Sequence, residues 1–135
     1  MKITQVICAP GKTGFFFDDQ KAIKNGAKND GAFYEGTPVT PGFTAVRQAG
    51  ESISVIFVLE NGAMAYGDCA AVQYSGAGGR DPLFLAKDFI PVIEKEIAPL
   101  YVGKEITTFR EMADRTDKYV DPKTGQKYHT AIRYG

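Results

Sequence analysis

Apolar and polar side chains alternate most regularly in the run SISVIFVLE, from Ser52 to Glu60. The odd-numbered positions of this run are all apolar: Ile53, Val55, Phe57 and Leu59. Successive side chains of an extended chain point to opposite faces, so these four share one face and the serines at 52 and 54 share the other. The alternation predicts a β-strand that buries one of its faces.

A hairpin is predicted directly after this strand. Asn61-Gly62 is a favoured pair for a two-residue type I′ turn, because both central positions of that turn need positive φ. We therefore expect a second strand, from Ala63 to about Ala70, to return antiparallel.

A third strand is predicted at the start of the chain. The run KITQVIC, from Lys2 to Cys8, is β-branched and partly alternating, and Pro10-Gly11 is expected to interrupt it. Residues 14–17 offer a continuation after that break. The three strands form an antiparallel meander, which needs helices to cover its apolar face.

The pattern changes to a helical period after the hairpin. Apolar residues recur at four-residue spacing: Leu85, Phe89, Ile93 and Ile97. This spacing predicts an amphipathic helix that faces the core. Asp81 is expected to cap the helix, with Pro82 at its first helical position. Pro91 removes a backbone hydrogen bond, so we expect a kink or a break there.

Two shorter helices are predicted nearer the C-terminus. Thr108 and Glu111 have the spacing of a capping box, and a helix to about Asp117 follows. A turn at 121–125 separates it from a last helical run that starts at Tyr128. A single helical turn at a chain end is poorly held, so we expect the sequence to be the front part of a longer protein.

The stretch from Asp18 to Val39 shows no clear period and is expected to be a long loop. Loops of this length are usually lids or binding loops, and this one is either a lid over a ligand or a packed Ω-loop. The pair Asp18-Asp19 lacks the spacing of a calcium-binding loop and is expected to lie on the loop surface.

Composition narrows the classes of function. Among 135 residues, 16 Lys and Arg balance 16 Asp and Glu, so no basic excess indicates nucleic acid or an anionic membrane as a partner. No apolar run approaches the ~20 residues of a membrane span, and the first residues do not have the pattern of a signal peptide. We expect a cytoplasmic protein. Cys8 and Cys69 lack any metal-site spacing and are expected to be reduced, packed thiols.

Candidate chemistry concentrates between Gly67 and Pro82, in GDCAAVQYSGAGGRDP. A glycine loop before a helix is typical of phosphate sites, but Gly76-Ala77-Gly78 lacks the third glycine of the dinucleotide fingerprint. The amide of Gln73 offers two donors and an acceptor, so it either orients a polar ligand or stabilises the turn. Arg80 either holds a carboxylate or is solvated or locally paired.

His129 is the single histidine, and the spacing places no serine or cysteine with a partner acid beside it. A lone histidine near a helix start is more often structural than catalytic. From its residues alone, the chain is an α+β domain in which a three-stranded antiparallel meander precedes a small helical bundle. It contains no complete catalytic constellation.

Three segments resemble a known family: GESISVIFVLENG, GDCAAVQYSGAGGRDPLFLAKDFIPVIEKEIAP and the terminal HTAIRYG. They look like the N-terminal region of methylaspartate ammonia-lyase, a member of the enolase superfamily. The resemblance covers essentially all 135 residues and is densest from Gly50 to Pro99. It implies that residues 1–135 form an enolase N-terminal-like cap domain and that the catalytic TIM-like barrel is absent from this chain.

The resemblance also implies a reaction, the reversible elimination of ammonia from (2S,3S)-3-methylaspartate to give mesaconate, with Mg²⁺ bound to the substrate carboxylate. The lysine and histidine that move protons and the three acidic metal ligands belong to the barrel. No catalytic residue and no metal ligand is therefore expected in this chain, and His129 does not match the catalytic histidine. The expected partners are the protein's own C-terminal barrel, the amino-acid substrate and a second copy in a homodimer.

Gln73 matches the family position that reaches toward the substrate amine, which makes it the expected substrate-binding residue. The stretch from Asp18 to Val39 matches another cap loop that closes over the barrel mouth. Two hypotheses stay open. The chain is either the cap of a carbon–nitrogen lyase, inactive alone, or a free-standing cap-like module that binds a small acid or a protein partner without catalysis.

Overall fold

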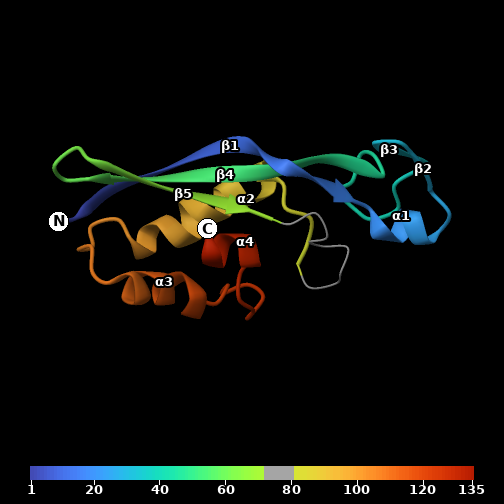
Figure 1. Cartoon of the computed structure of the whole chain (residues 1–135). Helices are drawn as coiled ribbons and strands as arrows, with labels where there is room; N and C mark the ends of the chain where they lie inside the picture. Colours follow the sequence, from blue (N-terminus) through green and yellow to red (C-terminus); the bar gives the residue numbers. More distant parts are fainter. Residues whose placement is uncertain (72–80) are drawn as a thin grey trace.

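In the computed structural model, three antiparallel strands form one layer and the helices α2, α3 and α4 lie on one side of it (Figure 1). The structure describes residues 1–71 and 81–135. The strands are β1 (Ile3–Asp18), β4 (Arg47–Leu59) and β5 (Met64–Ala70), in the order β1-β4-β5. The predicted meander is confirmed.

The central strand β4 explains the alternation in the sequence. Ile53 is fully buried, and Val55, Phe57 and Leu59 pack against the same core. The helices lie on this face of the sheet, so the apolar side of the strand is the covered side. The predicted orientation of the strand is confirmed.

Strand β1 runs through Pro10-Gly11, so the predicted break there is wrong. Pro10 pairs with Ile53 of β4. Because β1 lies at an edge of the sheet, the missing N–H of a proline removes little pairing. The irregularity falls later, where the register with β4 shifts between Lys12 and Phe16.

The hairpin between β4 and β5 is confirmed, but its turn is not type I′. Gly62 has a φ of 82°, and no described residue other than glycine has a positive φ, so Asn61 does not adopt the conformation that type I′ requires. The amide of Gly62 donates to the carbonyl of Leu59. The side chain of Asn61 accepts a hydrogen bond from the amide of Ala63 instead. One left-handed glycine therefore closes a longer connection.

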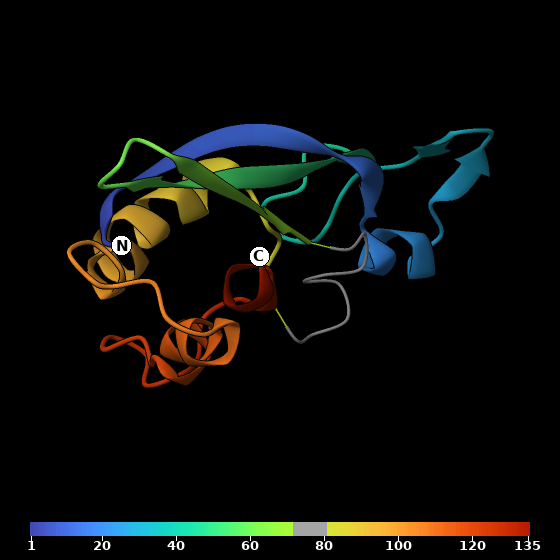
Figure 2. The same ribbon diagram turned by 60° about the vertical axis from the view of Figure 1, so that its left-hand side comes forward.

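The stretch from Asp18 to Val39 is not one long loop. It contains helix α1 (Gln20–Lys24) and a two-stranded hairpin of β2 (Lys28–Asp30) and β3 (Phe33–Glu35). These elements project from one end of the main sheet (Figure 2).

The three predicted helices are present, but the first begins at Ala86 rather than Pro82 and the last at Thr130 rather than Tyr128. Helix α2 (Ala86–Val92) continues into a π-helical turn, η1 (Ile93–Ile97), and a 3₁₀ turn, η2 (Ala98–Leu100). The regular helix thus ends close to Pro91, where a kink or a break was expected. Helix α3 (Phe109–Lys118) has the predicted capping box between Thr108 and Glu111. None of the helices in the described residues has the length and apolar character that crossing a membrane requires.

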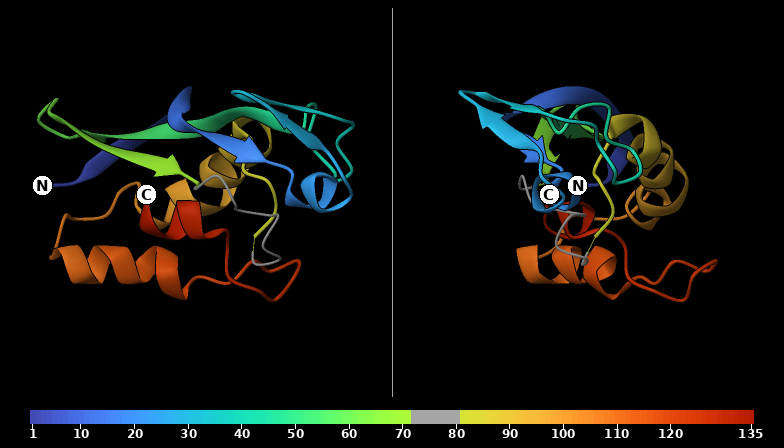
Figure 3. Two further views of the ribbon diagram at one scale, coloured as in Figure 1. Left: turned by 45° about the vertical axis from the view of Figure 1, so that its right-hand side comes forward. Right: turned by 90° about the vertical axis from the view of Figure 1, so that its right-hand side faces the viewer.

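The last helix, α4 (Thr130–Tyr134), lies between β5 and α3 (Figure 3). It is short, but Ala131 and Ile132 are buried in the main core. The expectation that this helix is poorly held is therefore wrong, because packing on both sides replaces the stability that a short helix lacks by itself.

Candidate functional site

Gln73, the residue that the sequence singles out most strongly, lies outside the described residues, as does Arg80. The structure describes the two flanks of this stretch. On one side, β5 leads to the buried Ala71, and on the other, residues 81–85 lead into helix α2. The contacts of these flanks define the frame of the candidate site.

The sequence predicts that Asp81 caps helix α2, and this prediction is wrong. Helix α2 begins at Ala86, five residues later, and its N-cap residue Leu85 makes no side-chain capping bond. The carboxylate of Asp81 instead accepts hydrogen bonds from the hydroxyl of Thr130, at 2.7 Å, and from the amide of Thr130, at 3.4 Å. Asp81 therefore ties the end of the undescribed stretch to the start of α4.

His129 makes a second connection between the segment that begins at Asp81 and the start of α4. The amide of Ala131 donates to Nδ1 of His129 at 3.0 Å, so Nδ1 carries no proton in the neutral ring. Nε2 is then the protonated nitrogen and donates to the carbonyl oxygen of Pro82 at 2.9 Å. The ring lies against Phe84 and Phe89, with centroids 5.1 and 5.2 Å away.

Burial lowers the pKa of His129 below its usual range, although the charge of Asp81 and the hydrogen bond to Pro82 act in the opposite direction. The neutral ring is the form that this environment requires, because Nδ1 must accept and Nε2 must donate. His129 thus has a structural role, because it joins the segment at Pro82 to the start of α4.

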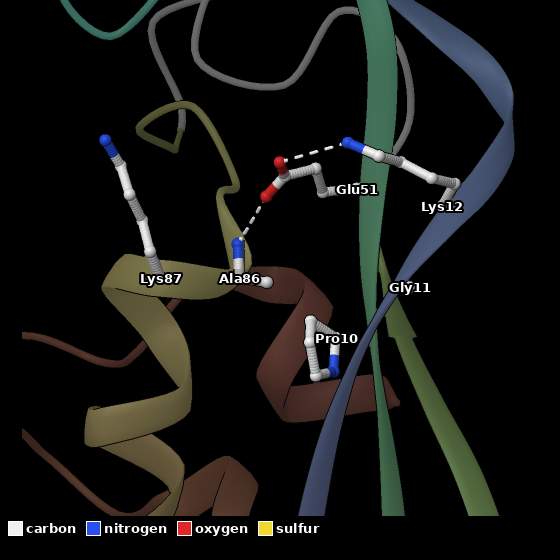
Figure 4. A pocket seen from close by; sticks show the side chains of 6 residues that line it. All are labelled: Pro10, Gly11, Lys12, Glu51, Ala86 and Lys87. Carbon is white, nitrogen blue, oxygen red and sulfur yellow. Dashed lines mark hydrogen bonds and ion pairs between the residues drawn. The ribbon is translucent and has the colours of Figure 1, made fainter.

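Glu51 of β4 holds the start of helix α2 (Figure 4). One carboxylate oxygen accepts from the amide of Ala86 at 2.7 Å, and the other lies 3.3 Å from the ammonium of Lys12. A pocket of about 360 Å³ opens beside this contact, lined by Pro10, Gly11, Lys12, Glu51, Ala86 and Lys87. Glu51 supplies the cap that Asp81 was expected to supply.

The other end of α4 contacts the flank that precedes the undescribed stretch. Gly135, which follows α4, leaves no room for a side chain, because a Cβ at that position is 2.7 Å from both Cα and Sγ of Cys69. Cys69 belongs to the end of β5 and is buried, and burial raises the pKa of its thiol to about 12. Helix α4 therefore contacts both flanks of residues 72–80.

Asp19, expected on the surface, is fully buried and organises the other candidate loop. Its carboxylate accepts four hydrogen bonds, from the amides of Ala22, Val39 and Thr40 and from the hydroxyl of Thr40. Burial by itself raises the pKa of this carboxyl group, but the hydrogen bonds, led by those from Thr40, outweigh it and lower the pKa to about 2. Asp19 is thus an ionised anchor that joins both ends of the stretch.

The neighbouring Asp18 is also buried and pairs with Arg47 of β4. The guanidinium makes two hydrogen bonds to the carboxylate, at 2.7 and 2.9 Å, and a third to the carbonyl of Ala32 at 3.1 Å. It also lies over the ring of Tyr34, 4.9 Å from the centroid. These contacts fasten the β2–β3 hairpin to the main sheet.

The described residues do not form a metal centre, since no three His, Cys, Asp or Glu side chains gather in residues 1–71 and 81–135. The family resemblance places the ligands of Mg²⁺ outside this chain, in the barrel. Cys8 and Cys69 are free thiols. The hydrogen bonds in these two ranges fix the stretch after β1 and the segment that begins at Asp81.

A family model described as methylaspartate ammonia-lyase N-terminus matches residues 1–135. This chain belongs to that family. It is 68% identical to methylaspartate ammonia-lyase of Clostridium tetanomorphum and 59% identical to that of Citrobacter amalonaticus. Each match covers 100% of this chain and 32% of the relative. The chain thus spans about a third of the length of the curated relatives it matches.

Solved structures of methylaspartate ammonia-lyases have the same fold over the whole chain. The Mg complex of Clostridium tetanomorphum β-methylaspartase matches with a TM-score of 0.93 and 68% identity, and its Q73A variant with 0.93 and 67%. The Citrobacter amalonaticus enzyme containing (2S,3S)-3-methylaspartic acid matches with 0.90 and 58%. Each match covers 100% of this chain and 32% of the solved chain. The α+β class is confirmed by these matches.

The sequence did not predict that the carboxylates of Asp81, Glu51 and Asp19 hold other segments in place by hydrogen bonds. The partners of Asp81 and Glu51 lie 49 and 35 residues away, and no local pattern marks such pairs. The sequence did contain a signal for the position of Asp19, because aspartate is a preferred N-cap residue. Asp19 is the N-cap of helix α1.

Proposed function

We propose that this chain is the N-terminal cap domain of a carbon–nitrogen lyase that reversibly eliminates ammonia from (2S,3S)-3-methylaspartate to give mesaconate. In this reaction the C3–H and C2–N bonds break, a C2=C3 double bond forms, and ammonia leaves. The observation that carries the proposal is the match of all 135 residues to methylaspartate ammonia-lyases, in sequence and in fold.

The catalytic groups and the metal ligands belong, in this proposal, to a C-terminal barrel that residues 1–135 do not include. The relatives are about three times as long as this chain, which leaves ample length for such a barrel. One solved relative is a Mg complex, so Mg²⁺ is the proposed cofactor, and it supplies a positive charge to the substrate carboxylate when bound. The difference in length also favours the hypothesis of a lyase cap domain over that of a free-standing cap-like module.

Gln73 is the proposed substrate-binding residue, and its side-chain amide is assigned to the substrate amine. A neutral amide fits this task because its carbonyl oxygen accepts a hydrogen bond from an ammonium group without adding a charge that would hold the product ammonia. The comparisons agree with a glutamine shared by this chain and the Clostridium tetanomorphum enzyme. The sequence identity is 68% with that enzyme and 67% with its Q73A variant, as expected if the substitution removes one identical residue.

The described residues that support this role lie in the stretch after β1 and in the segment that begins at Asp81. Asp19 and Arg47 fix the stretch after β1, and Asp81, His129 and Glu51 fix the segment that follows residues 72–80. A cap that closes over an active site excludes water from it, and we assign this task to the stretch after β1. A homodimer and a cytoplasmic location complete the proposal, and both rest on the sequence alone.

The Gln73 assignment is tested by kinetics of the full-length protein in the direction of amine addition to mesaconate. Gln73→Ala is expected to lower the kcat/KM for ammonia by about tenfold or more, because one lost charge-assisted hydrogen bond is worth about 1.5–3 kcal/mol, and to lower it less for a bulkier amine such as methylamine, which has one N–H fewer to donate. Mg²⁺ affinity should not change. Wild-type kinetics with both amines in the variant would show that the assignment is wrong.

A further inference from the structure

Strand β2 forms an open edge of the hairpin that projects from the main sheet (Figure 2). The small sheet consists of β2 and β3, so within residues 1–71 and 81–135 strand β2 is paired on one side only. All three of its residues, Lys28, Asn29 and Asp30, are exposed. The backbone N–H and C=O groups on the open side of such a strand can pair with a strand of another chain.

The hairpin is small, but contacts with the main sheet support it. The guanidinium of Arg47 bonds the carbonyl of Ala32 in the turn of the hairpin and lies over the ring of Tyr34. The same guanidinium is paired with the buried carboxylate of Asp18. A two-stranded hairpin is only marginally stable by itself, and these contacts give the open edge of β2 a defined position relative to the main sheet.

The charges of β2 are complementary to those of an identical strand. When two copies pair antiparallel with Asn29 opposite Asn29, Lys28 of each copy lies opposite Asp30 of the other. Opposite charges in facing positions stabilise a pair of strands, and like charges destabilise it. The next registers that keep the side chains on matching faces are shifted by two residues, and they place Lys28 opposite Lys28 or Asp30 opposite Asp30. The charges therefore favour the one register that is centred on Asn29.

Lys28 and Asp30 are also available for such a contact. Among the ion pairs of the described part of the chain, none includes either side chain. Within the hairpin, Glu35 of β3 lies opposite Lys28, and Phe33, which is 66% exposed, lies opposite Asp30. In the paired form each lysine lies in a row between Glu35 of its own copy and Asp30 of the other. Two such rows are related by the two-fold axis of a symmetric dimer.

We propose that the open edge of β2 is a docking surface for a second copy of this chain, which pairs through the same edge to give a four-stranded sheet in the order β3-β2-β2-β3. A second copy is the occupant because its charges match those of β2 on both sides of the two-fold axis. The inference rests on the homodimer of the proposed function and names a surface for it, but it does not require the lyase reaction. The contact uses the β2 edge alone, and the remaining residues of the stretch after β1 keep the task of closing over the active site.

Charge reversal in the full-length protein tests the contact, with the dimer dissociation constant measured by analytical ultracentrifugation and the fold of each variant checked by thermal unfolding. Asp30→Lys and Lys28→Asp should each raise this constant about tenfold or more, because both facing pairs become repulsive. Mixing the two variants should restore association, since their heterodimer again has opposite charges in both pairs. Glu94→Lys reverses an exposed charge of η1; it is the control and should keep the wild-type constant.

A disulfide tests the register. Directly opposite residues of paired antiparallel strands have Cα atoms about 4.5–5.5 Å apart, which is within the range of a disulfide. Asn29→Cys in the full-length protein should therefore form a disulfide-linked dimer with oxidised glutathione. The wild type and Lys24→Cys, which places a thiol on the exposed surface of α1, should not.

The proposal is overturned by a wild-type protein that stays monomeric, by reversals that leave the dimer dissociation constant unchanged, by a mixture that does not associate, or by Asn29→Cys that does not cross-link. Reversals that lower thermal stability without weakening the dimer would show that another part of the protein covers β2, and this also overturns it. A protein that dimerises as described but forms no mesaconate would refute the lyase function and leave the β2 contact standing.

Discussion

The carboxylate of Asp81 binds both the hydroxyl and the amide of Thr130, so a residue that precedes helix α2 is bonded to the first residue of helix α4, next to the N-cap residue His129. Helix α2 in turn receives its cap from Glu51 of β4. The amide of the first residue of each of these two helices therefore donates to a carboxylate from another part of the chain. These hydrogen bonds connect the sheet, residues 81–85 and the last helix. The connected elements include both flanks of residues 72–80.

Acidification should weaken the fold through His129. The folded protein lowers the pKa of this residue below its ordinary value of 6.5, so between the two pKa values the unfolded chain binds a proton that the folded chain does not. The contribution of His129 is fully present above about pH 6.5 and is lost as the pH falls through the folded-state pKa. Urea unfolding of wild type and His129→Gln at about pH 7.5 and pH 5.5 measures this contribution.

The expected result is a smaller loss of stability on acidification in His129→Gln than in wild type, because glutamine does not titrate. Other groups face His129, with Asp81 and Thr130 at the start of α4 and the rings of Phe84 and Phe89 beside it. Asp81 is the one carboxylate among these groups, so Asp81→Asn is measured in parallel. Identical pH dependence in wild type and His129→Gln would contradict the account.

Asp19→Ala should destabilise the fold by about 2–4 kcal/mol, because it removes the N-cap of α1 and leaves the amides of Val39 and Thr40 without their acceptor. The matched control is Asp30→Ala, which removes an exposed carboxylate from the neighbouring hairpin and should change stability by no more than about 0.5 kcal/mol. Chemical unfolding gives both values. Equal, small effects of the two substitutions would show that Asp19 does not anchor the stretch.

Patterns with local causes were predictable from the sequence. The alternation from Ser52 to Glu60 reports burial of one strand face, the four-residue period from Leu85 reports a core-facing helix, and the Thr108 capping box closes within three residues. Each of these signals depends on residues that are close together in the chain. The meander and the helices therefore followed from them.

Features with distant partners were not predictable in the same way. Asp81 precedes a proline and an apolar helical run, which favours a cap on that helix, but helix α2 does not begin until Ala86 and the carboxylate of Asp81 binds Thr130 instead. Asp18 and Asp19 read as surface residues because charged side chains are usually exposed, and only Arg47 and Thr40, brought near by the fold, make their burial favourable.

The central claim is that this chain is the cap of a methylaspartate ammonia-lyase, and mesaconate formation tests it most directly. The full-length protein with (2S,3S)-3-methylaspartate and Mg²⁺ should show growing ultraviolet absorbance from mesaconate, and a chelator should stop it. Residues 1–135 alone should show none. Absence of mesaconate from the folded full-length protein with Mg²⁺, or Mg²⁺-dependent mesaconate formation by residues 1–135 alone, would contradict the account.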